Sequence, residues 1–119
     1  MVRGVAAVWV PVQDMDRAVS FYRDVLGLPV GMQSDEWTEV DAHGLLLGLN
    51  GREGLGAQAD GGAVISFQPD GDDIDAEVER LQAVGVTFTG GVSSYDWGRL
   101  APFKDSEGND LQLYEPPNN

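Results

Sequence analysis

The chain has 119 residues, of which 42% are hydrophobic and 23% charged, a composition typical of one globular domain. It contains no run of about 18 apolar residues that could cross a bilayer, so we expect no membrane partner. The absence of cysteine excludes disulfides, thiolate metal sites and cysteine nucleophiles. The first residues, Met1 to Gly4, do not resemble a secretion signal, and we therefore expect a cytoplasmic protein.

Charge gives the first indication of possible partners. The chain carries 20 acidic and 7 basic residues, a formal net charge of −13, and its basic residues are scattered singly. A nucleic-acid-binding protein needs clustered lysine and arginine, so nucleic acid is excluded as an expected partner. The acidity favours either simple solubility or attraction of a cationic small molecule, and the sequence alone leaves both interpretations open.

The first half of the chain predicts one helix and four strands. The apolar, β-branched run Val5–Val12 is typical of a strand. Asp14 or Asp16 then begins a helix that Gly27 ends. Residues 28–32, 36–42 and 45–50 follow as strands, with a turn at His43 and Gly44. The predicted order is β-α-β-β-β.

The second half predicts the same order. A strand over residues 62–69 leads to a capping turn at Asp70–Asp73 and a helix over residues 74–84 that Gly85 ends. Further strands are predicted over residues 86–89, 97–104 and 110–115.

Fixed offsets between the halves indicate an internal repeat. Asp14 and Asp72, Ala18 and Ala76, and Gly27 and Gly85 are each 58 residues apart, and the turns at residues 41–44 and 105–108 are 64 apart. The difference places about six additional residues around positions 90–95. We predict one α+β domain over residues 1–119, with module 1 (1–50), a glycine-rich linker (51–61) and module 2 (62–119).

Two segments give the chain a resemblance to a known family over nearly its whole length. The helix segment 11–28, with Phe21-Tyr22 and Leu26-Gly27, and the hairpin Asp105-Ser-Glu-Gly-Asn109 resemble the vicinal oxygen chelate superfamily. That superfamily includes glyoxalase I, extradiol dioxygenases, fosfomycin resistance enzymes and bleomycin resistance proteins. The resemblance implies two tandem βαβββ modules whose curved mixed sheets surround a cavity, commonly completed by a homodimer.

The resemblance also implies where a metal would be held in the enzymatic members, by His and Glu side chains on the first and last strands of each module. The matching positions here are Ala7, Gly48, Ala63 and Gln112. Alanine and glycine have no donor atom, and a neutral amide is a poor sole anchor for a transition metal. We therefore expect no metal, no other cofactor and no catalytic residue of the family's kind.

Other polar groups have simpler explanations. The only histidine, His43, is expected to be a solvated turn residue. The acidic residues at 70–75 are better explained as helix caps than as a calcium loop, and residues 105–110 as a hairpin turn. Gly61-Gly62 lacks the Lys-Ser/Thr of a phosphate-binding loop.

Strand alternation predicts an aromatic pocket in place of the metal site. If Ala7 faces the cavity, Trp9 does as well, because every second residue of a strand lies on the same face. By the same alternation, three further sets are expected to face the cavity: Leu46, Gly48 and Asn50; Ala63, Ile65 and Phe67; and Asp110, Gln112 and Tyr114. Phe21, Tyr22, Phe88 and Phe103 are assigned to the core. The small residues Ala7, Gly48 and Ala63 are expected to leave room for a ligand in this pocket. The predicted ligand-binding residues are Ala7, Trp9, Trp37, Gly48, Asn50, Ala63, Phe67, Tyr95, Trp97, Gln112 and Tyr114.

Two functions are compatible with these sequence features, and an inert structural or regulatory homologue is a third alternative. The first is a metal-independent protein that binds and sequesters a cytotoxic natural product, similar to the bleomycin resistance branch. The second is an enzyme acting on a small oxygenated compound without the usual metal site, with Glu39, Asp41, His43 or Asp110 in reach. We favour the first: a homodimer whose ligand is aromatic, neutral or cationic, and stacks on Trp9 and on Trp37 or Trp97.

Overall fold

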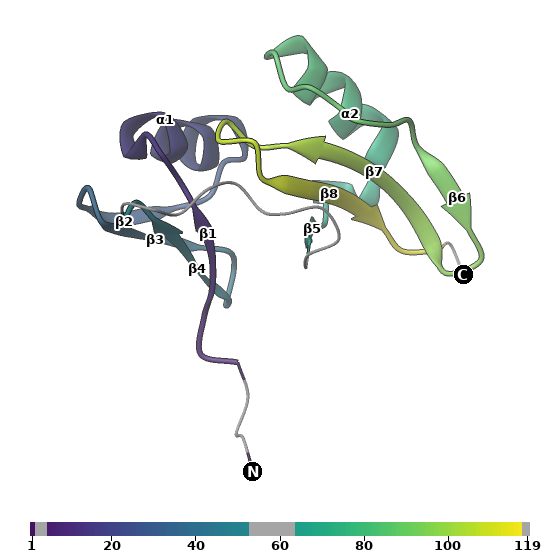
Figure 1. Cartoon of the computed structure of the whole chain (residues 1–119). Helices are drawn as coiled ribbons and strands as arrows, with labels where there is room; N and C mark the ends of the chain where they lie inside the picture. The colour runs from purple at the N-terminus through teal and green to yellow at the C-terminus, as the bar shows by residue number, and fades with distance from the viewer. Residues whose placement is uncertain (2–4, 53–63, 118–119) are drawn as a thin grey trace. The chain divides into compact units, whose positions relative to one another are not determined.

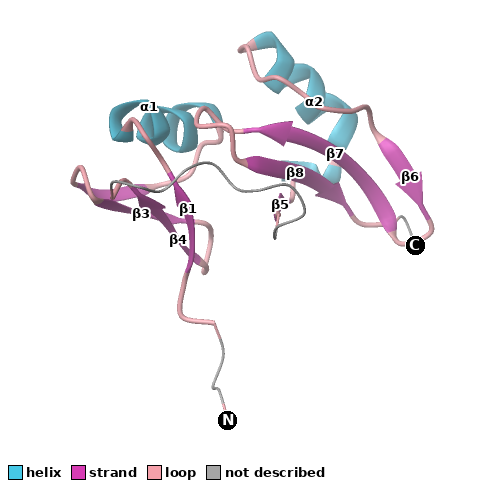
Figure 2. Cartoon of the chain, in the orientation of Figure 1, coloured by secondary structure: helices cyan, strands magenta, loops and turns pink. Residues whose placement is uncertain are grey.

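A computed structural model describes Met1, residues 5–52 and residues 64–117 of the chain. The chain forms two compact units, Met1–Ala59 and Asp60–Asn119. Each described unit contains one four-stranded mixed sheet and one main helical segment (Figure 2). The predicted α+β class and the two repeated modules are confirmed. Most of the predicted linker, residues 53–61, lies outside the described residues.

The first unit follows the predicted βαβββ order. Its sheet has the strand order β1-β4-β3-β2, with β1 parallel to β4 and the other pairs antiparallel. Its elements are β1 (Val8–Pro11), α1 (Met15–Ser20), the π-helical turn η1 (Phe21–Val25), β2 (Val30–Gln33), β3 (Trp37–Asp41) and β4 (Leu46–Asn50). The predicted first strand thus begins three residues late, at Val8 instead of Val5.

The core of the first unit lies between α1 and one face of its sheet. Asp14 caps the helix, because its Oδ1 accepts a hydrogen bond from the Arg17 backbone N at 3.1 Å. Gly27, with φ of +78°, ends the helical segment as predicted. Ala18 and Tyr22 are fully buried, as are Val10 and Leu49 on the strands. The helix therefore covers only one face of the sheet, as Figure 1 shows.

The second unit repeats the arrangement with a longer hairpin. Its sheet order is β5-β8-β7-β6, with β5 parallel to β8. Its elements are β5 (Ile65–Phe67), the short 3₁₀ turn η2 (Asp70–Asp72), α2 (Ile74–Ala83), β6 (Ser93–Tyr95), β7 (Gly98–Lys104) and β8 (Asp110–Glu115). Ile74 and Leu81 of α2 are buried, as are Leu111 and Leu113 of β8.

The edge strand of the second sheet is not where the sequence predicts it. Residues 86–89 form no strand, and only a single bridge joins Phe88 to Phe103. Thr87 and Thr89 exchange two backbone hydrogen bonds with β7. Instead, β6 pairs regularly with β7, and it lies within the additional residues that the repeat placed around positions 90–95. A short β-branched run predicts a strand from local preference, whereas pairing depends on non-local register.

The residue that caps α2 is one position later than the 58-residue offset of the repeat predicts. Asp73 accepts the capping hydrogen bond from the Ala76 backbone N at 3.1 Å. Asp72 instead has φ of +53° and accepts from Gln68 Nε2 at 2.6 Å. The pairing of Asp14 with Asp72 was therefore wrong, and the structural equivalent of Asp14 is Asp73.

The two predicted hairpin turns are both present, but they differ in burial. In the second unit, Asp105 Oδ1 accepts from the backbone N of Glu107 and of Asn109, both at 2.8 Å. Its Oδ2 accepts from Asn109 Nδ2 at 2.9 Å, and both residues are buried. In the first unit, exposed Asp41 accepts one bond, from the Gly44 backbone N at 3.2 Å.

Candidate functional site

The candidate site begins on the face of the first sheet that α1 does not cover, which we call the α1-distal face. Strand register puts Trp9 beside Gly48, and Gly48 beside Glu39, across three neighbouring strands. Because paired residues share a face, Trp9, Gly48 and Glu39 lie on the same side of the sheet. Alternation adds Trp37 and Asp41 of β3. Two predicted aromatic residues and two carboxylates therefore share this face.

The ring of Trp37 lies directly over Gly48. A Cβ added at Gly48 would overlap three ring carbons of the Trp37 side chain. The expectation that Gly48 leaves open space in the pocket was wrong, because the indole ring occupies that space. Trp37 Nε1 also donates a hydrogen bond to Glu39 Oε2 at 3.4 Å, so the ring is held from two sides.

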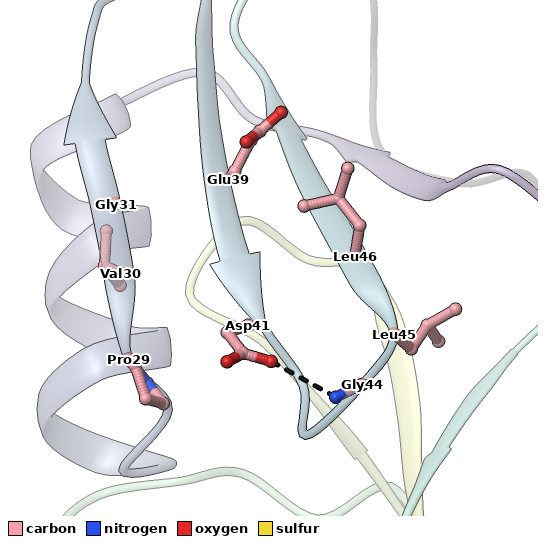
Figure 3. Close-up of a pocket in the computed structure, with 8 residues that line it drawn as sticks. All are labelled: Pro29, Val30, Gly31, Glu39, Asp41, Gly44, Leu45 and Leu46. Carbon is pink, nitrogen blue, oxygen red and sulfur yellow. Dashed lines mark hydrogen bonds between the residues drawn. The ribbon is translucent and has the colours of Figure 1, made fainter.

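Beside these residues the face is hollowed. The hollow has a volume of about 480 Å³, and Figure 3 shows Glu39 and Asp41 of β3 among its walls. It is lined by Pro29, Val30, Gly31, Glu39, Asp41, Gly44, Leu45 and Leu46. Alternation predicted the direction of Leu46, and Glu39 and Asp41 were placed within reach of a site. The β2 residues were missed, because no local signal in the sequence says that β2 pairs with β3.

The remaining predicted residues of the first unit lie at the ends of strands. Trp9 is 46% exposed on β1, an edge strand, and Ala7 precedes that strand half-buried. Asn50 is buried at the end of β4. Its Oδ1 accepts hydrogen bonds from the backbone N and the Nη1 of Arg52, at 3.2 and 3.3 Å. Asn50 therefore fixes the chain where it leaves the sheet.

In the second unit the structure brings three predicted aromatic residues together. The rings of Tyr95 and Trp97 are stacked at 4.7 Å with an interplanar angle of 1°, and Trp97 lies 6.5 Å from Tyr114. Tyr114 Oη donates to the Trp97 carbonyl at 2.9 Å. Gly98, with φ of +140°, permits this packing, since an added Cβ would meet the Tyr114 ring and the Glu115 carbonyl. Tyr95 and Trp97 are about half exposed.

The register of β5 corrects one predicted site residue. Ser66 pairs with Gln112, and Gln112 Nε2 donates to Ser66 Oγ at 2.5 Å. Phe67 instead pairs with Leu113, which is buried on the opposite face. The expectation that Ile65 and Phe67 share a face with Gln112 was therefore wrong by one residue, a slip that reverses every side chain of a strand. Ala63 lies outside the described residues.

Polar groups elsewhere in the second unit are engaged in structural contacts. Arg99 bonds to Asp75 at 2.9 and 3.0 Å and to Glu115 at 3.3 Å, joining β7 to α2 and β8. The hydrogen bonding of Arg99 to the Asp75 carboxylate, which accepts from it, is the main cause that raises the pKa of the Arg99 guanidinium. Lys104 Nζ lies 2.6 Å from Asp110. Asp110, a candidate in the enzymatic alternative, is thus paired with a lysine.

A family comparison agrees with this architecture. The family described as the glyoxalase/bleomycin resistance protein/dioxygenase superfamily matches residues 4–113. The chain belongs to this superfamily. No curated protein sequence matches the chain.

Several solved structures share the fold along nearly the whole chain. The fosfomycin resistance protein FosX from Listeria monocytogenes is 19% identical with a TM-score of 0.78, covering 96% of this chain and 93% of its own. TnmS3, an antibiotic binding protein from Streptomyces sp. CB03234, is 28% identical with a TM-score of 0.72 and 98% coverage of both chains. UcmS2 is 23% identical with a TM-score of 0.73, covering 96% and 98%. These three likenesses show that the chain shares the fold of these proteins.

The residues at the superfamily's metal positions do not fit a metal ion. Gly48 has no donor atom and lies beneath an indole ring, while the Gln112 amide is hydrogen-bonded to Ser66. Ala7 also lacks a donor. Over residues 5–52 and 64–117, no three His, Cys, Asp or Glu side chains gather as a metal site. In the same described part of the chain, no helix is long and apolar enough to span a membrane.

Proposed function

We propose that this protein binds a cytotoxic natural product in the cytoplasm, without a metal ion, and protects the cell by sequestering it. The single observation that carries the proposal is the ring of Trp37 lying over Gly48. At a position where metal-dependent relatives are expected to place a ligand, this chain offers an aromatic surface. Such a surface binds planar compounds by stacking and by apolar burial.

The likeness to TnmS3 supports the same proposal. TnmS3 is an antibiotic binding protein, and the two chains match over 98% of each at 28% identity. A protein that only sequesters its ligand needs no acid, base or metal. It needs a complementary surface, and the α1-distal face supplies Trp9, Trp37 and the adjoining hollow. Tyr95, Trp97 and Tyr114 of the second unit are proposed as further ligand contacts.

The positions of His43 and Asp110 do not favour the enzymatic alternative. His43 is exposed in a turn with φ of +56°, and Asp110 is paired with Lys104. A general acid or base needs a position within hydrogen-bond reach of a substrate held in place. We therefore propose no catalytic residue and no cofactor, and we propose that the active form is a homodimer.

Quenching of tryptophan fluorescence by a panel of cytotoxic natural products tests this function. The proposal predicts saturable quenching by at least one aromatic compound, confirmed by calorimetry at one ligand per chain. Trp9→Phe, Trp37→Phe and Trp97→Phe variants identify which ring reports the binding. Failure of every panel compound to bind a cooperatively folded protein would count against the function.

A further inference from the structure

We propose that the hollow between β2, β3 and β4 is a subsite for an organic cation, such as a protonated amine, with Glu39 as its main counter-ion. The inference rests on the proposed function and specifies the ligand class, because it requires a positive charge next to an aromatic group. It concerns the first unit alone.

The size and walls of the hollow suit a small organic group. Its volume of about 480 Å³ falls in the range of roughly 300–1,000 Å³ that is common for ligand pockets. Pro29, Val30, Leu45 and Leu46 supply apolar walls. Figure 3 shows Glu39 and Asp41, both of which line the hollow, on the same strand, with Asp41 turned to the Gly44 N. The hollow thus combines apolar walls with a few polar anchors, as small-molecule sites do.

In the described part of the chain, no basic side chain is paired with the acidic groups of the hollow. Within residues 5–52 and 64–117, no lysine or arginine forms an ion pair with Glu39 or Asp41. Ion pairs of the described residues instead join Arg23 to Asp24, Arg80 to Glu77, Arg99 to Asp75 and Glu115, and Lys104 to Asp110. Two like charges on one strand face attract a cation, and an ammonium between them would relieve their mutual repulsion.

Local contacts orient the two carboxylates and leave each with acceptor capacity. The Glu39 carboxylate accepts from Trp37 Nε1 through Oε2, and Asp41 accepts from the Gly44 backbone N through Oδ1. A carboxylate has about four acceptor positions, so both groups can accept from a ligand ammonium. The Trp37 ring beside Glu39 adds an aromatic face, to which organic cations are attracted.

A matched pair of probes separates charge from shape. Calorimetry compares 9-aminoacridine, a planar cation, with acridine, which has nearly the same shape, at a pH where acridine is neutral. The parent chain should bind 9-aminoacridine about tenfold more tightly or better, the ratio expected for a charge-assisted contact. Equal binding of the two probes, or binding of neither, would overturn the inference.

Glu39→Gln tests the counter-ion, with Glu36→Gln as its control. Glu39→Gln should weaken 9-aminoacridine roughly tenfold and leave acridine within about twofold. Glu36→Gln makes the same change in net charge on an exposed residue that does not line the hollow, and should change both affinities by less than about twofold. An unchanged 9-aminoacridine affinity in Glu39→Gln would be inconsistent with Glu39 as counter-ion.

Gly31→Leu tests the location by filling the hollow. A Cβ at Gly31 would meet only the Glu39 carbonyl O, at 3.7 Å, an ordinary contact distance, and Gly31 does not have a positive φ. The variant should therefore fold, as thermal unfolding checks, yet bind 9-aminoacridine at least about tenfold more weakly. A folded Gly31→Leu that binds 9-aminoacridine like the parent would place the cation elsewhere.

These tests distinguish failure of the subsite from failure of the proposed function. If a panel compound binds Glu39→Gln and Gly31→Leu as tightly as the parent, the subsite is wrong and the function stands. If no panel compound binds while 9-aminoacridine depends on Glu39, the subsite stands and the function is wrong.

Discussion

The indole ring of Trp37, on β3, lies over the Cα of Gly48, on the neighbouring strand β4. This packing requires a glycine, because a Cβ at position 48 would overlap the ring. Gly48 is buried although it carries no side chain, because the ring covers it. A stability difference between variants can test this relationship.

Gly48→Ala should destabilise the protein by about 1 to 3 kcal/mol, since the added methyl group forces the ring or the strand to move. In a Trp37→Ala background the same substitution should cost less than about 1 kcal/mol, because the ring that the methyl group would overlap is then absent. Urea unfolding of the four proteins of this double-mutant cycle gives the coupling. Equal costs in the two backgrounds would show that the ring does not rest on Gly48.

Asp105→Ala should destabilise the second unit by about 2 to 3 kcal/mol, since it removes the buried carboxylate that accepts from the backbone N and the Nδ2 of Asn109. Asp41→Ala is the matched control at the equivalent turn, where one exposed bond is lost, at a cost of about 1 kcal/mol or less. Chemical unfolding of both variants measures the difference. Similar losses would contradict the special role of the buried turn.

Trp9→Ala should weaken binding of the panel's tightest compound by more than about tenfold, the usual effect of truncating an anchoring tryptophan. Trp9 is 46% exposed on an edge strand, so the variant should remain folded. Met32→Ala is the control, because it removes a 91% exposed apolar side chain from the same sheet. Calorimetric titration measures the affinity of both variants. Equal affinities of Trp9→Ala and Met32→Ala would contradict the role of Trp9.

The protein should be a homodimer, because chains of the resembled superfamily commonly complete their cavity with a two-fold partner. Light scattering at micromolar concentration should return about twice the 12.8 kDa of one chain. A particle of monomer mass, unchanged by added ligand, would contradict this prediction.

The sequence predicted the features that depend on nearby residues. Asp14 caps its helix, Gly27 ends the helical segment, and the turns at residues 41–44 and 105–108 form where they were expected. Each of these features is decided by hydrogen bonds or backbone angles within a few residues.

The errors at β5, at residues 86–89 and at the hollow concern pairing between distant segments. The face of Phe67 depends on how β5 aligns with Leu111–Leu113, and a slip of one residue reversed it. The strand expected at residues 86–89 lost its place at the sheet edge to β6. The hollow needed the pairing of β2 with β3, and the covering of Gly48 needed the direction of the Trp37 side chain. No local sequence pattern predicts this strand pairing or this side-chain direction.

Metal independence is the central claim, and calorimetric titration of the panel's tightest compound into EDTA-treated protein tests it most directly. A metal-independent site predicts one ligand per chain and the same affinity with and without EDTA, with elemental analysis showing far less than one transition metal per chain. Added Zn²⁺, Ni²⁺, Mn²⁺ or Fe²⁺ should not raise the melting temperature, because only ligands of the native state stabilise it. Binding that disappears in EDTA and returns with one of these ions would contradict the claim.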